Sequence, residues 1–160
     1  MRRAEPLAGL GGAALFVSLF LTWYRADAVV PDDETGVYIY ASGGDSTSAW
    51  SFFTAIDVEL AVLAALFLAV PLTSLLTRGP AKAIGTAVLA SAFGWIAVLL
   101  VAFRLLFPPF PDFDGVTIST AAGGFVALAG AIVGWVGSWL SMRDESTPGA
   151  KAPVVPILDA

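Results

Sequence analysis

Residues 119–142 read STAAGGFVALAGAIVGWVGSWLSM and contain no charged residue. A helix needs about 20 mostly apolar residues to cross a hydrocarbon core of roughly 30 Å. Arg143, Asp144 and Glu145 follow directly and end the apolar run. The stretch therefore predicts a transmembrane helix.

Small residues recur along this segment at alternating spacings of four and three. We call them the small-residue seam: Gly123, Ala127, Gly130, Gly134, Gly137 and Ser141. In lipid, small residues let two helix backbones approach and gain van der Waals contact. The seam predicts a close helix–helix contact. Its partner is either a helix of the same chain, with Gly11, Ala14 and Ser18 as candidate matches, or a second copy of the chain.

Three more stretches are long and apolar enough to span, at residues 7–24, 53–76 and 83–107. Hydrophobic residues make up 58% of the chain and charged ones 13%, about half the charge of an average soluble domain. The sequence thus predicts an all-α membrane protein, with a four-helix transmembrane bundle in residues 1–142. We expect the Pro-containing tail, residues 143–160, to be cytoplasmic and disordered.

Charge predicts the orientation. One side of the predicted membrane carries six bases: Arg2, Arg3, Arg78, Lys82, Arg143 and Lys151. The other side carries Arg25 and seven acids: Asp27, Asp32, Asp33, Glu34, Asp45, Asp112 and Asp114. The positive-inside rule then places both termini in the cytoplasm and residues 25–52 and 108–118 in outer loops. We expect a multi-pass protein of the cytoplasmic (inner) cell membrane.

One alternative concerns the first span. Arg2 and Arg3, the apolar run and Ala26-Asp27-Ala28 resemble a secretory signal with its cleavage site. The run is longer than a typical signal core and ends in Trp23-Tyr24-Arg25. Cleavage would leave three spans and an outer N-terminus.

Aromatic residues and short β-like runs lie near the predicted interfaces. Trp23, Tyr24 and Trp50 are expected in the outer aromatic belt, and Trp139 in the inner one. The runs at 36–40 and 115–118 alternate β-formers and are predicted to pair as a small extracellular ribbon.

Three ionisable residues fall within predicted spans: Asp57, Glu59 and Arg104. At about 1.5 Å per residue from the inner turn, Arg104 and Asp57 reach roughly 31 and 28 Å, so they lie at nearly the same level. This predicts a salt bridge between them. The alternatives are a snorkelling Arg104, Asp57 as a helix cap, or a proton or ion relay. Asp57 and Glu59 point about 200° apart and cannot line one path.

The absence of Cys and His from the sequence removes thiolate sites, most zinc sites and the commonest general base. Asp112-Phe-Asp114-Gly115 resembles the opening of a calcium loop but lacks its later ligands. A net charge of −5 with the acids outside offers no nucleic-acid surface. We therefore expect no enzyme, no cofactor, no metal site and no nucleic-acid partner.

Three segments carry a resemblance across nearly the whole chain: Leu19–Tyr24, Trp50–Asp57 and Trp139–Glu145. With the Met-Arg-Arg start, they resemble small four-span membrane proteins of high-GC, actinobacterial-type bacteria. The resemblance implies the four-span layout and brings no activity with it.

Two functions follow as hypotheses. The first is a non-catalytic integral membrane protein that binds a partner, or itself, through the outer loops or the small-residue seam. The second is a small oligomeric transporter or channel subunit that uses Asp57 and Arg104. The ligand, the partner and the oligomeric state are not encoded in any motif.

Overall fold

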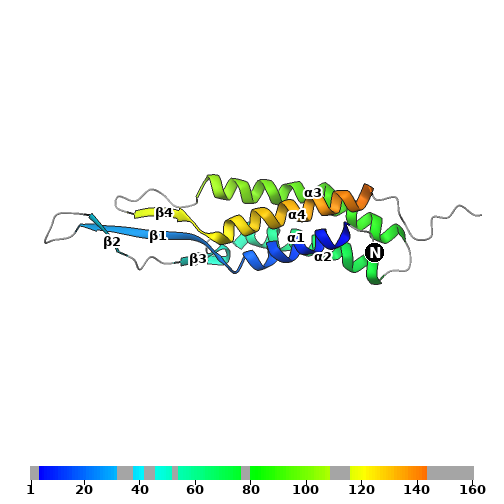
Figure 1. The fold of residues 1–160 in the computed structure, drawn as a ribbon, viewed down its shortest axis with the longest axis horizontal. Coiled ribbons are helices and arrows are strands. Elements are labelled where there is room, and N and C mark those ends of the chain that lie inside the picture. Colours follow the sequence, from blue (N-terminus) through cyan, green and yellow to red (C-terminus); the bar gives the residue numbers. More distant parts are fainter. Residues whose placement is uncertain are drawn as a thin grey trace, which may run out of the picture.

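The computed structural model describes residues 4–31, 38–41, 46–51, 54–76, 80–108 and 116–143. The chain forms, in order, α1 (Glu5–Ser18), β1 (Thr22–Pro31), β2 (Tyr38–Ala41), β3 (Ser46–Ser48), a short 3-10 helix η1 (Ala49–Ser51), α2 (Thr54–Leu76), α3 (Pro80–Leu106), β4 (Val116–Thr120) and α4 (Ala122–Arg143). The four helices lie side by side in an elongated bundle, and the strands extend from one end of it (Figure 1). We call this the sheet end. The opposite end, where α1 begins and α4 stops, is the terminal end.

Three helices are long and apolar enough to cross a membrane: Ala55–Leu76, Lys82–Leu106 and Ala122–Arg143. Large apolar side chains are exposed on their outer surfaces, for example Val62, Leu99 and Phe125, which are 62%, 56% and 59% accessible. A soluble monomer rarely leaves such a continuous apolar surface in water. The membrane-protein prediction therefore holds for these three helices.

The first helix is shorter than predicted. It ends at Ser18, and the chain leaves the helix through turns in which the Leu19, Phe20 and Leu21 nitrogens donate to carbonyls three residues earlier. The strand β1 then starts at Thr22, so the prediction of helix up to Tyr24 was wrong. With 14 residues, α1 is about 21 Å long and does not by itself meet the length of a span.

The sheet is built around β1. Ala28 pairs with Ala41 of β2 and with Val116 of β4, and Tyr24 pairs with Thr47 of β3 and with Thr120 of β4. All pairs are antiparallel. Because the same β1 residues pair with β4 on one side and with β2 or β3 on the other, β2 and β3 share one edge of β1 and β4 lies along the opposite edge.

This topology corrects the predicted ribbon. The strands at Tyr38–Ala41 and Val116–Thr120 form near the predicted places, but each pairs with β1 instead of with the other. The sequence did not predict β1 because the first residues of this strand continue the apolar run of the first helix, and they were assigned to the end of that helix. The protein is mostly helical with a four-stranded sheet, not all-α.

The other helix boundaries differ less from prediction. Residues 119 and 120, assigned to the fourth span, belong to β4, and α3 starts at Pro80 and ends at Leu106. In the predicted outer loop 25–52, β1 to β3 and η1 replace much of the expected irregular chain. The acidic cluster at 32–34, the calcium-loop-like segment at 112–115 and the tail beyond Arg143 lie outside the described residues.

The four helices surround a common core. α1 packs on α4 and α2, and α3 packs on α4 and α2. The Phe67 ring, fully buried, fills the centre between two glycines: a Cβ added at Gly94 or at Gly134 would lie 2.8 or 2.5 Å from it. Large and small residues thus interlock where α2, α3 and α4 meet.

Candidate functional site

A small cavity, lined by both ionisable and apolar side chains, lies at the sheet end of the bundle, where α2 begins and α3 stops. Its walls include Tyr24 from β1, Asp57 from α2 and Arg104 from α3, together with Trp23, Ser48, Ala49, Ile56 and Leu60. The cavity has a volume of about 10 Å³. That is close to the minimum that one water molecule needs.

Arg104 reaches this cavity because it continues the buried stripe of α3. Residues at spacings of three and four face inward along this helix: Ala87, Ala90, Gly94, Ala97 and Val101. Arg104 is the next position in that series and is 9% accessible. It is therefore buried rather than extended outward along the helix surface.

Asp57 occupies the matching position on α2. It heads a buried stripe that continues with Leu60, Ala64, Phe67 and Val70, and it is 2% accessible. Its Oδ2 atom is buried and accepts no hydrogen bond from the described residues. Glu59, two positions on, is exposed. Only Asp57 of the two acids lines the cavity, as the 200° separation requires.

Tyr24 joins β1 to the end of α3. Its hydroxyl donates a 2.6 Å hydrogen bond to the carbonyl oxygen of Arg104, and its side chain is buried. Next to it, the Trp23 indole donates at 2.7 Å to the carbonyl oxygen of Ser18, at the end of α1. Trp23 and Tyr24 are both buried, at 3% and 4% accessible, and their expected place in the outer aromatic belt stays a prediction.

The cavity brings opposite charges into a space with little water. Arg104 acts electrostatically on Asp57, and both act on the Tyr24 hydroxyl. The predicted salt bridge between Asp57 and Arg104 stays a prediction, while their convergence at one level of the bundle is observed. A buried carboxylate oxygen beside a water-sized space can bind one water molecule or carry a proton. Within the described residues no three acidic side chains gather as a metal site.

The small-residue seam is covered within the chain. All six of its residues are buried. A Cβ added at Gly130 would lie 2.6 Å from the Leu15 nitrogen, and one added at Gly137 would meet the Ala8 backbone. α1 and α4 are thus in backbone contact, and Gly11 of the candidate match faces Gly130 and Gly134 directly.

One buried acid was overlooked in the sequence. Glu5, in the first turn of α1, is 2% accessible. It begins the inward-facing series that continues with Ala8, Gly11, Leu15 and Ser18. The period of that series was the available signal, but Glu5 precedes the apolar run and so reads as a solvent-exposed residue.

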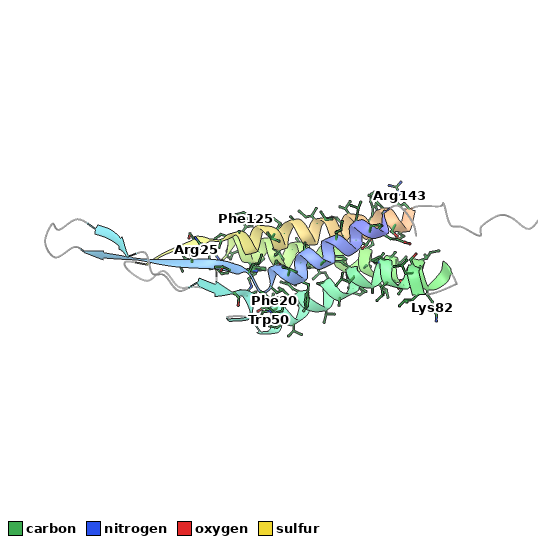
Figure 2. All side chains as sticks on the ribbon, turned by 60° about the horizontal axis from the view of Figure 1, so that its bottom comes forward. Phe20, Arg25, Trp50, Lys82, Phe125 and Arg143 are labelled. Atoms are coloured by element: carbon green, nitrogen blue, oxygen red, sulfur yellow. The ribbon has the colours of Figure 1, made fainter. Side chains whose placement is uncertain are left out.

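The two remaining belt tryptophans are exposed. Trp50 is 37% accessible and its ring centroid lies 6.1 Å from that of Phe20 at the sheet end. Trp139 is 41% accessible near the terminal end. Figure 2 shows Phe20 and Trp50 close together at one end of the bundle, and Lys82 and Arg143 toward the other.

No family model matches the chain, and no curated protein matches it.

Proposed function

We propose that this is a non-catalytic integral membrane protein that presents its β-sheet to a partner protein on the outer side of the cytoplasmic membrane. One observation carries the proposal: β1 continues for ten residues beyond the turn that follows α1, and the sheet built on it extends away from the helices (Figure 1). A sheet that extends from a bundle offers backbone and side-chain surface that the bundle itself does not use.

The occupied seam strengthens this choice. Of the two surfaces expected to bind a partner, the seam on α4 is already filled by α1 at backbone distance. A second chain would have to displace α1 to use it, and would lose those contacts. The sheet is therefore the better candidate surface.

The edge of β4 can receive a partner strand. The Ala121 N–H donates to the Trp23 carbonyl at 2.7 Å, and the register continues from this pair into β4. Successive backbone N–H groups alternate between the two edges of a strand. The N–H groups of Ser119 and Thr117 therefore point toward β1, and the N–H group of Val116 points to the opposite edge of β4. In the described part of the chain no strand pairs with that edge, which makes strand addition by a partner feasible.

Site-specific crosslinking tests the partner directly. A photoreactive amino acid at Ser119, which is exposed on β4, should trap a protein that co-purifies in mild detergent and is identified by mass spectrometry. The same group at Leu99, exposed on α3, is the control. If the two positions trap the same proteins, or neither traps any, the proposal fails.

A pair of proline variants separates edge binding from loss of the sheet. Val116→Pro removes an N–H from the outer edge of β4, whereas Thr117→Pro removes one that faces β1. We expect Val116→Pro to keep the thermal stability of the protein and lose the crosslink. Thr117→Pro should lower both. A full crosslink in stable Val116→Pro protein would exclude this edge as the binding surface.

The proposal includes four crossings with both termini in the cytoplasm. Residues 7–23 run beside α4 from Gly137 to Gly123, about 21 Å along that helix, which supports a fourth crossing made of a helix followed by extended chain. The turn donors after Ser18 find carbonyl partners, as a crossing in lipid demands.

Cysteine labelling tests this topology cleanly because the chain contains no Cys. An impermeant maleimide added to intact cells should label Ser119→Cys and should label Lys82→Cys only after the membrane is opened. Labelling of Lys82→Cys in intact cells, or of both variants alike, would overturn the orientation.

A second candidate is a small transporter or channel subunit that uses Asp57 and Arg104. The observation in its favour is the buried Asp57 oxygen beside the water-sized cavity. Liposome flux decides: a flux abolished by Asp57→Asn and by Arg104→Gln, in protein that still folds, supports it. Absent flux, or flux unchanged in both variants, removes it.

A further inference from the structure

An apolar groove lies on the lipid-facing side of α4 near the terminal end. It has a volume of about 390 Å³ and is lined by Trp135, Val136 and Trp139. The Trp135 indole is held in place by a 3.1 Å hydrogen bond to the Ser91 carbonyl of α3. One wall of the groove is thus fixed across two helices, while Val136 and Trp139 remain exposed.

The positively charged Arg143 side chain lies beside this groove. The Arg143 guanidinium carbon lies 4.7 Å from the centroid of the Trp139 ring, a cation–π distance. Stacking uses the flat face of the guanidinium and leaves its N–H edges able to donate. At about 1.5 Å per residue, Trp139 lies roughly 6 Å and Trp135 roughly 12 Å below Arg143 along the helix.

We propose that this groove binds an anionic phospholipid of the bilayer, with one acyl chain against Trp135 and Trp139 and the phosphate on Arg143. The order of the groups matches that of the lipid: Arg143 is the last residue of α4, and the apolar groove lies one to two turns before it along the helix. Basic residues near the cytoplasmic membrane surface attract anionic headgroups. The inference requires α4 to be in a membrane and is independent of the partner protein proposed for the sheet.

The test uses purified full-length protein in detergent and measures binding of phosphatidylglycerol and phosphatidylcholine by native mass spectrometry. We expect one phosphatidylglycerol molecule to bind tightly and phosphatidylcholine to bind at least about fivefold more weakly, the effect of one basic residue near an anionic headgroup. Equal binding of the two lipids would overturn the proposal.

Two matched pairs of variants locate the site. Arg143→Gln and Lys82→Gln each remove one exposed positive charge at the terminal end. Trp139→Leu and Trp95→Leu each remove one exposed indole, and Trp95, on α3, does not line the groove. We expect Arg143→Gln to weaken phosphatidylglycerol binding about fivefold, the effect of one basic residue, and Trp139→Leu to weaken it measurably. Lys82→Gln and Trp95→Leu should leave it nearly unchanged.

The remaining outcomes also decide. If Lys82→Gln weakens binding as much as Arg143→Gln, the attraction is diffuse charge and the site is not real. If Trp139→Leu binds like the unsubstituted protein, the acyl chain does not use the groove and the proposal fails. All four substitutions alter exposed side chains, and equal thermal stability in detergent confirms that each variant is folded.

Discussion

The contact between α1 and α4 and the contact between α2 and α3 join helices of one bundle by different means. Between α1 and α4, glycines such as Gly11 and Gly130 bring two backbones together. Between α2 and α3, the large Phe67 ring packs on the small surface at Gly94. A backbone cannot move aside without shifting its whole helix, whereas a side chain can rotate. The first contact should therefore tolerate added volume much less than the second.

The largest expected effect is at the backbone contact. Gly130→Ala or Gly11→Ala places a methyl group against the opposite backbone, and we expect destabilisation of more than about 3 kcal/mol, above the usual range for overpacking. Unfolding in increasing mole fractions of sodium dodecyl sulfate, followed by circular dichroism, measures it. A loss below about 1 kcal/mol would show that α1 is free to move on α4.

An intermediate loss of stability is expected at Gly94, where the neighbouring atoms belong to side chains and not to a helix backbone. Gly94→Ala puts a methyl group 2.8 Å from a Phe67 ring carbon and 2.9 Å from Trp135. Small shifts of these side chains, without movement of a whole helix, should limit the cost to about 1–3 kcal/mol. If the same unfolding experiment gives a cost equal to that of Gly130→Ala, the distinction between the two contacts is wrong.

A smaller loss of stability is expected from breaking the hydrogen bond between β1 and the end of α3 at the sheet end. Tyr24→Phe removes the hydrogen bond to the Arg104 carbonyl but keeps the buried ring. The expected loss of stability is about 1 kcal/mol, the net value of one hydrogen bond. Unchanged stability would mean that the link between β1 and α3 contributes nothing to the bundle.

The smallest effect provides the control. Gly85 lies on α3 with nothing within 4 Å of where its Cβ would be. Gly85→Ala should leave the stability unchanged or raise it by up to about 1 kcal/mol, through helix propensity alone. A marked loss in this variant would indicate that glycine substitutions destabilise the bundle for a reason other than packing.

Part of the site was predictable and part was not. Counting residues along two helices placed Asp57 and Arg104 at one level, and both line one cavity. The small residues at Ala87, Ala90, Gly94 and Ala97 could have shown that Arg104 lies on a buried stripe. The inward positions of Trp23 and Tyr24 could not be predicted, because their partners are the Ser18 and Arg104 carbonyls, and only the folded chain brings these near.

The three long apolar helices and the period of the small-residue seam follow from the order of the amino acids alone. Both are local properties, since bilayer thickness sets the length of a span and the helix repeat sets which residues share a face. Contacts in the folded chain, in contrast, determine that α1 stops at Ser18, that β1 becomes the central strand and that α1 covers the seam. These outcomes depend on pairing between segments far apart in the chain, where hydrogen bonds of β1 to β3 and β4 replace those of a longer helix.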